Sequence, residues 1–410
     1  MKKILATILA LVLALGLCSV SWAADGEATV SSKEELEQAL NDSSVTTIKL
    51  GANITASITI AAGKDVTLNL NGHTLTNTDG QHTITNNGTL TITGTGTVDN
   101  VSHARAAIVN NGTATLNGGT YTRSKENPEN NAEDAGGNSF YTILSDNGAK
   151  MTINEGVTVT NVGNFSSMIR NGGTSASTLI INGGTFSGGL NAIKNDEAGV
   201  LTINGGDFSN TSQFVVMNWH KTTINGGSFK ALSSADAVLF TAKYAENKAV
   251  GELTIKNGTF ERAADTQKML EVTYKGENGN VLYTGTAAIY SGVFAGDVSA
   301  YATEGTAVAS LKGVYYVGAA NIESAVNSMN GGDTLTVVKG EVTINGTKYS
   351  KESNTTYTKP TSYYYYSPST TTPDTTKGSP KTFDAGVGIY AVTAVLSVTG
   401  MAWTAKKRGN

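Results

Sequence analysis

The sequence predicts an all-β fold, a parallel β-helix with about nine to ten coils of roughly 21–25 residues each. Three observations lead to this prediction. An eight-residue motif recurs along the chain, each copy combines strand-like alternation with a glycine turn, and no helix-length apolar pattern separates the copies. The 47 glycines among 410 residues agree with many short strands joined by tight turns.

The motif is clearest in three consecutive copies. Residues 179–186, 201–208 and 222–229 read LIINGGTF, LTINGGDF and TTINGGSF. Apolar and polar residues alternate as in a strand with one buried face, and Asn-Gly-Gly then bends the chain. Looser copies end at Leu75, Val98, Tyr121, Val159, Phe260 and Phe294. A second turn precedes many copies and predicts about three strands per repeat; its asparagines include Asn86, Asn110, Asn171, Asn195 and Asn218.

Stacked coils explain this recurrence better than antiparallel hairpins, which would not repeat one octapeptide every 21–23 residues. Equivalent positions of neighbouring coils then lie about 4.8 Å apart. The turn asparagines are predicted to form a ladder in which each amide bonds the backbone of the next coil. The last motif position is predicted to form a buried ladder, whose aromatic members are Tyr121, Phe186, Phe208, Phe229, Phe260 and Phe294.

Residues 45–312 resemble the right-handed β-helix proteins of the pectin-lyase-like superfamily in repeat pattern and length. The resemblance implies right-handed coils and includes no enzymatic motif. We place the β-helix domain at residues 24–349. A capping-box pattern, Ser32 to Glu35, predicts a short helix at 33–41 that covers the first coil. Residues 314–349 are predicted to close the other end with a short helix and two strands.

The N-terminal residues 1–23 have the layout of a secretory signal peptide. Lys2 and Lys3 precede an uncharged apolar run, and Ser21-Trp22-Ala23 offers small residues for cleavage. The single cysteine, Cys18, lies inside this segment. Cleavage at Ala23 would therefore leave a chain without disulfides or thiolate metal sites.

The C-terminal part predicts a tether. Residues 350–384 form a linker rich in Thr, Tyr and Pro, which is expected to stay disordered. Residues 385–410 follow as an apolar stretch with a basic tail, long enough to span a bilayer.

The end of the chain resembles a Gram-positive cell-wall sorting signal, with the motif residues Ser379, Pro380, Lys381, Thr382 and Phe383. The resemblance implies that a sortase cuts after Thr382 and joins it to the cell wall. Ser379 and Phe383 depart from the family's Leu and Gly. The alternative is a plain transmembrane anchor, and both interpretations place residues 24–378 outside the cell.

The charge and composition of the chain limit which partners it can bind. The chain has 29 basic and 33 acidic side chains and no basic stripe, which disfavours nucleic acid as a partner. The four histidines share no metal-ligand spacing, so neither a metal nor another cofactor is expected. We expect a monomer.

Enzymes that resemble pectate lyases or polygalacturonases place acids, or acids with Arg or Lys, on neighbouring coils. Aligning the octapeptides reveals no acids at equivalent positions one or two coils apart, so we expect a non-catalytic protein. The opposite interpretation, a wall-tethered polysaccharide lyase or glycoside hydrolase, would need two carboxylates to converge. A carboxylate beside Arg170 or Arg262 would serve equally.

Two features are candidate contact sites. The first is an insertion at residues 122–139, because solenoids carry function on loops that leave one flank; its charged residues are Arg123, Lys125, Glu126, Glu129, Glu133 and Asp134. The second is Trp219 with His220, which replaces a regular turn. The sequence thus predicts an adhesin-like surface protein that contacts a glycan or a host protein. A structural envelope component remains the further alternative.

Overall fold

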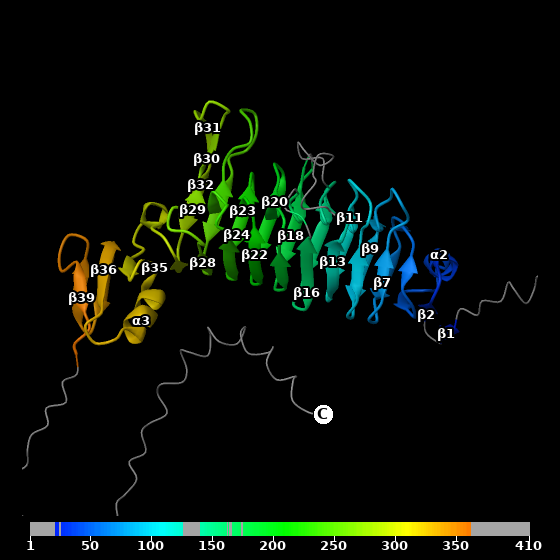
Figure 1. Ribbon diagram of the computed structural model, residues 1–410, viewed down its shortest axis with the longest axis horizontal. Coiled ribbons are helices and arrows are strands. Elements are labelled where there is room, and N and C mark those ends of the chain that lie inside the picture. The colour runs from blue at the N-terminus through cyan, green and yellow to red at the C-terminus, as the bar shows by residue number, and fades with distance from the viewer. Residues whose placement is uncertain are drawn as a thin grey trace, which may run out of the picture.

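The structure is a computed structural model that describes residues 21–23, 26–125, 140–161, 163, 166–173 and 175–361. The chain forms an all-β solenoid of stacked parallel strands, as predicted (Figure 1). Each coil contributes one strand to each of three sheets, here named A, B and C. The described residues contain nine complete coils, from β3–β5 to β27–β29, and a partial coil made by β32 and β33.

The strands of each sheet are given in their order along the stack. Sheet A consists of β1 (Ser21–Ala23), β2 (Glu27–Val30), β3 (Thr47–Leu50), β6 (Asp65–Asn69), β9 (Thr89–Thr93), β12 (Thr113–Leu116), β15 (Lys150–Ile153), β18 (Ser177–Ile181), β21 (Gly199–Ile203), β24 (Lys221–Ile224), β27 (Glu252–Ile255) and β32 (Thr286–Ile289). Sheet C consists of β5 (Ile58–Ile60), β8 (Ile84–Asn86), β11 (Ile108–Asn110), β14 (Ile143–Ser145), β17 (Ile169–Asn171), β20 (Asn191–Asn195), β23 (Phe214–Asn218), β26 (Ala237–Thr241) and β29 (Lys268–Glu271).

Sheet B is parallel along the coils and antiparallel at its C-terminal end. It consists of β4 (Ile54–Thr55), β7 (Thr74–Thr76), β10 (Thr97–Asp99), β13 (Gly119–Arg123), β16 (Val157–Asn161), β19 (Thr185–Ser187), β22 (Asp207–Thr211), β25 (Ser228–Ala231), β28 (Thr259–Glu261), β33 (Gly292–Phe294), β35 (Val314–Val317), β34 (Val308–Leu311), β36 (Thr334–Lys339) and β39 (Thr356–Thr358). Two hairpins stand apart, β30 (Thr273–Lys275) with β31 (Val281–Thr284), and β37 (Glu341–Ile344) with β38 (Thr347–Ser350).

The buried ladder at the last motif position is confirmed. Nine residues on successive strands of sheet B are in register, and all are buried. Phe186, Phe208, Phe229, Phe260 and Phe294 stack ring on ring with centroids 4.5–4.9 Å apart. Val159 separates Tyr121 from this stack, and the Tyr121 hydroxyl donates to the Gly118 carbonyl instead. These rings form core and offer no platform for a sugar.

The asparagine ladder is confirmed and makes more bonds than predicted. Asn86, Asn110, Asn171, Asn195 and Asn218 are buried. The Asn195 amide, for example, donates to the Asn218 side chain at 2.9 Å and to the Lys221 carbonyl at 3.0 Å. A second, exposed ladder joins the turn asparagines that follow the sheet A strands, at Asn154, Asn182, Asn204 and Asn225.

Helices lie at the two ends of the stack. Helix α2 (Lys33–Asn41) covers the predicted range; the Ser32 hydroxyl accepts from the Glu35 amide, and the Glu35 carboxylate accepts from the Ser31 amide. Its Leu36 and Ala39 belong to the main core. Near the other end, α3 (Ala319–Ser328) packs in a smaller apolar cluster with strands that include β34 and β36, and a 3₁₀ turn lies at Ser299–Tyr301.

The linker boundary predicted at residue 350 is wrong. Strand β39 pairs with β36, and the Tyr357 side chain is buried in the same cluster as α3. The alternating Thr and Tyr residues looked like linker but provide one buried aromatic on a strand. No helix of the described part is long and apolar enough to cross a membrane. The predicted apolar segment 385–410 and the sorting motif lie outside the described residues, as do positions 1–20 of the signal segment.

His82 gives the fold a pH dependence. Burial lowers the pKa of His82, the nearby Arg105 lowers it further, and its Nδ1 accepts the Ala106 amide at 2.9 Å. The unfolded chain therefore takes up a proton near pH 6.5 that the folded chain resists. We expect the stability from neutral His82 to be complete above pH 6.5 and to fall as the pH drops below it. Urea midpoints from about pH 8 to about pH 5 measure this. His82→Asn should flatten that slope, and an equal slope in both proteins would contradict the assignment.

Candidate ligand-binding face on sheet C

The outer face of sheet C carries a row of side chains that changes character along the stack. On each strand, the residue before the row position is apolar and points inward. The residue after it belongs to the buried asparagine ladder or takes the equivalent place. Its members from β14 to β29 are in register, and they are Leu144, Arg170, Lys194, Met217, Phe240 and Glu271. The row is thus ionic on β17 and β20 and apolar on β23 and β26.

The ionic part of the row contains two converging acids. Arg170 Nε lies 2.7 Å from Asp196 Oδ2, and Arg170 Nη1 lies 3.8 Å from Asp146 Oδ2. Lys194 Nζ lies 3.4 Å from the same Asp196 oxygen. Burial opposes ionisation of the guanidinium, but the hydrogen bond and charge of Asp196 prevail and raise the pKa of Arg170. The Arg170 guanidinium also lies 5.7 Å from the centroid of the Tyr141 ring.

This convergence corrects the sequence prediction that no acids align. Asp146 follows Ser145 and Asp196 follows Asn195, and these two residues lie two coils apart in register with Asn171. Asp146 and Asp196 therefore occupy equivalent positions, with Arg170 on the coil between them. Alignment on the octapeptides missed the pair because the acids lie in the second turn, outside the octapeptide, and the chain between coils there varies in length.

The apolar part of the row borders a pocket of about 470 Å³. Five of its lining residues are apolar or aromatic: Phe214, Met217, Trp219, Phe240 and Tyr274. Seven are polar or charged: Gln213, Asp236, Thr266, Lys268, Glu271, Thr273 and Lys275. Trp219 makes edge contacts with Phe240, Tyr274 and Tyr244 at centroid distances of 4.8, 5.2 and 5.3 Å. Phe214, Trp219 and Phe240, with Tyr274 packed against them, form a cluster separate from the main core of the solenoid.

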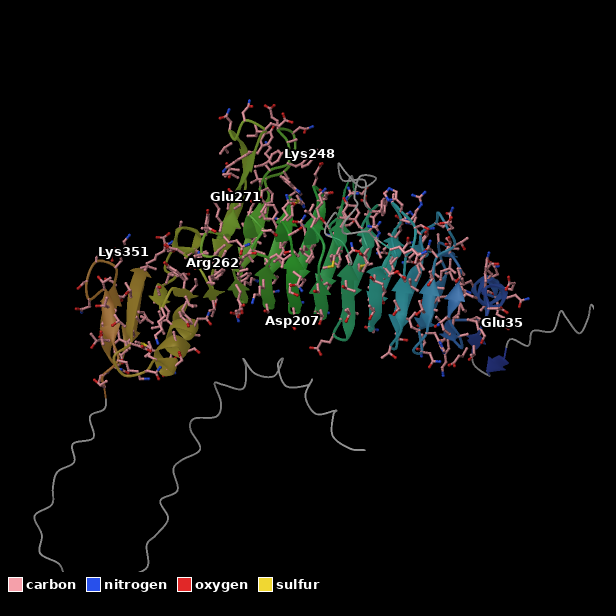
Figure 2. The ribbon with its side chains drawn as sticks, in the orientation of Figure 1. Glu35, Asp207, Lys248, Arg262, Glu271 and Lys351 are labelled. Carbon is pink, nitrogen blue, oxygen red and sulfur yellow. The ribbon has the colours of Figure 1, made fainter. Side chains whose placement is uncertain are left out.

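A projection rises beside the pocket. We define the flank projection as the loop 243–251 together with the β30–β31 hairpin, which extends from the stack in Figure 1. Lys243 Nζ lies 5.7 Å from the Tyr283 ring centroid, which joins loop and hairpin. Lys248 pairs with Glu197 at 2.5 Å. In Figure 2, Lys248 and Glu271 lie on the side of the solenoid with the projection, whereas Asp207 lies at the opposite edge.

Glu271 is the best-anchored acid of the pocket. Its carboxylate accepts hydrogen bonds from the Lys268 ammonium and from the Thr273 hydroxyl. Burial acts to raise the pKa of Glu271, but these hydrogen bonds outweigh it and lower the pKa overall. The carboxylate is therefore a fixed acceptor at the rim of an aromatic pocket. No three His, Cys, Asp or Glu residues of the described ranges gather as metal ligands.

The structure separates the two residues of the predicted recognition pair, because only Trp219 lines the pocket. Trp219 lines the pocket, but it is 5% exposed and acts as a wall rather than as a protruding contact. Its indole nitrogen is buried and has no hydrogen-bond partner in the described structure. His220 is not among the lining residues; its Nδ1 lies 3.1 Å from the Gly199 carbonyl of the preceding coil.

The predicted binding loop is placed only at its start. Arg123 is 2% exposed and donates to the Phe140 carbonyl, so its prediction as a surface contact is wrong. A buried cation that holds the base of the insertion explains its presence there. Lys125 is exposed. Glu126, Glu129, Glu133 and Asp134 lie outside the described residues. Arg262 pairs locally with Asp265 at 3.1 Å.

Sequence reasoning missed most of the pocket, because its residues come from β23, β26, β29 and the hairpin. Besides Trp219, the available signal was the apolar residue at the row position, Met217 and Phe240, because Lys194 and Arg170 occupy this position one and two coils before Met217. Comparison of the chain with protein-family models, with curated proteins and with solved structures found no match.

Proposed function

We propose that this protein is a non-catalytic, adhesin-like surface rod that binds a glycan in the pocket on sheet C. The carrying observation is the composition of that pocket, in which aromatic walls face fixed polar groups. Aromatic rings pack against the C–H faces of a sugar, while carboxylate, amide and hydroxyl groups bond its hydroxyls. The volume of about 470 Å³ is in the range of small-ligand pockets.

The balance of the lining favours a sugar over an apolar ligand. Pockets for apolar molecules are lined predominantly by hydrophobic side chains with a few polar groups. Here seven of twelve lining residues are polar or charged. Both signs are present, Lys268 and Lys275 against Asp236 and Glu271, so no single-sign field selects a strongly charged ligand. A neutral, hydroxyl-rich unit of a longer glycan satisfies these groups best.

Glycan arrays and then titration calorimetry with neutral oligosaccharides test the proposal. Glu271→Gln removes the charged acceptor, and we expect it to weaken binding about tenfold, the effect of losing one charge-assisted hydrogen bond. Tyr274→Ala should weaken binding further because it removes an aromatic wall. Glu261→Gln is the matched control, since Glu261 pairs with Lys230 at 3.2 Å on sheet B, away from the pocket. Equal affinity of the wild type and both pocket variants would refute the proposal.

Glycoside hydrolysis is the second candidate function, supported by the alignment of Asp146 with Asp196. Two equivalent positions two coils apart are separated by roughly 9.6 Å, close to the spacing of inverting hydrolases. The arrangement argues against it in one respect. Inverting hydrolysis needs a water between the two carboxyl groups, and Arg170 occupies that place with 2.7 Å and 3.8 Å contacts. Release of reducing ends from a bound glycan by the wild type, lost in Asp196→Asn, would favour the enzyme.

The location of the rod is part of the proposal. The signal-like residues 1–23 and the motif from Ser379 to Phe383 support secretion and attachment to a Gram-positive cell wall through Thr382. We further propose that α2 covers the first coil and that the coils are right-handed. Mass spectrometry of the C-terminal peptide from fractionated cells tests the anchor. A chain that ends at Thr382 in the wall fraction supports sorting, whereas an intact 385–410 tail in membranes indicates a transmembrane anchor.

A further inference from the structure

The flank projection concentrates the exposed apolar surface of the described residues. The most exposed large apolar side chains are Val281, Leu282 and Tyr290 at 53%, 52% and 52%, with Tyr244 and Val250 at 42% each. Four of these five lie on the projection, and only Tyr290 lies elsewhere. Scattered exposed apolar residues are ordinary, but a cluster on one protruding element indicates an interaction surface.

The hairpin also presents an unpaired strand. β30 and β31 form a sheet of two strands, and β31 has no other strand partner within the described chain. Thr273 and Tyr274 of β30 line the pocket and are half-buried, whereas Val281, Leu282 and Thr284 of β31 are exposed. β30 also has no further strand partner, but its side chains line the pocket, so the edge of β31 is the more accessible one. A two-stranded hairpin is only marginally stable alone, and added strands stabilise it.

The open edge lacks the features that keep sheet edges apart. Natural proteins protect such edges with lysine, proline or inward charges. β31 reads Val-Leu-Tyr-Thr and has neither a charge nor a proline. Strand β30 ends with Lys275 and the turn after it carries Glu277, so the tip of the hairpin has one charge of each sign and does not repel the tip of a second copy.

We propose that β31 pairs with β31 of a second copy of this chain, which joins the two hairpins into a four-stranded antiparallel sheet. Antiparallel pairing of identical strands is self-complementary and closes as a two-fold dimer. A register centred on Leu282 places the two Leu282 side chains opposite each other and each Val281 opposite a Tyr283 of the other copy, an apolar–aromatic pair that stabilises sheets. Because the strand is uncharged, no like charges meet. This replaces the monomer that we expected from the sequence.

The contact is small, since it consists of two short strands and the apolar residues beside them, so the dimer is weak and reversible. Rods held on one cell surface would nevertheless be concentrated enough to use it. Because the strands pair at the projection, the pairing does not cover the row of side chains on sheet C. Self-association and glycan binding are therefore separable properties.

Sedimentation velocity of the full-length chain in detergent, over about two decades of concentration, tests the pairing. We expect a reversible monomer–dimer equilibrium whose dissociation constant rises at least tenfold in Leu282→Lys. Tyr290→Lys is the matched control, because it adds the same charge at an equally exposed apolar residue outside the projection; its equilibrium should equal that of the wild type. Glycan binding should persist in Leu282→Lys, which shows that the variant folds.

Two outcomes would overturn the inference. One is a wild-type chain that stays monomeric at every concentration. The other is association that Leu282→Lys leaves unchanged, which would assign the contact to another segment, such as the apolar residues 385–405. If the wild type stays monomeric but captures an added β-strand peptide, the edge binds a foreign chain and the homotypic pairing is wrong.

Discussion

Replacing Phe208 by alanine should lower the free energy of unfolding by about 3–5 kcal/mol, the usual cost of emptying a buried aromatic site. Phe208 is 1% exposed and stacks against Phe186 and Phe229 at 4.5 and 4.9 Å, so two ring contacts are lost with the side chain. Because each coil of a solenoid contacts only its neighbours, the loss of stability should be concentrated in β19, β22 and β25. Urea unfolding measures the total loss of stability, and amide hydrogen exchange shows which strands it affects.

Phe208→Leu is the control for this prediction. Leucine takes the equivalent position at Leu75, so the ladder accepts an aliphatic side chain. The substitution should cost less than half as much as Phe208→Ala, because it leaves a smaller cavity. If both variants lost the same stability, the ring stack would not be the source of the effect. A loss below about 1 kcal/mol in Phe208→Ala would show that the coil collapses into the space.

Removal of the Asn195 side chain should cost about 2–5 kcal/mol, because several buried polar groups lose a partner at once. Its amide donates to the Gly199 carbonyl, the Asn218 side chain and the Lys221 carbonyl at 2.9, 2.9 and 3.0 Å. Its side-chain oxygen accepts from the Asn171 amide at 2.8 Å. Asn195→Ala leaves these groups unpaired inside the protein, and the thermal midpoint should fall accordingly.

The exposed ladder supplies the matched control. Asn204 makes the same kind of side-chain contacts, donating to Asn182 at 2.8 Å and accepting from Asn225 at 2.7 Å. Water can replace those bonds, so Asn204→Ala should cost less than about 1 kcal/mol. Asn195→Ser should be milder than Asn195→Ala, because Ser145 already occupies an equivalent rung. Similar losses at positions 195 and 204 would contradict the role that we assign to burial.

Only a small part of the candidate site was predicted from the sequence. Trp219 stood out because it interrupts a regular turn, and the structure places it in the pocket wall. Tyr274 and Glu271 gave no signal, because Glu271 lies at the end of β29 and Tyr274 lies on the hairpin, and no motif marks either position. Arg123 looked like a loop residue by its neighbours in sequence, yet its side chain turns inward and bonds Phe140 across the insertion.

The sequence by itself determined the coil, the turn chemistry and both inward ladders, since a period of two and an Asn-Gly-Gly turn are local patterns that each repeat carries in full. Only the tertiary structure decided which outward side chains meet. Contacts such as Arg170 with Asp196, or Trp219 with Tyr274, join coils whose connecting segments differ in length. Their register is fixed by backbone bonds between strands far apart in sequence. The architecture of the rod can therefore be predicted from the sequence of one repeat, whereas the side chains that meet on its surface depend on how all the coils stack.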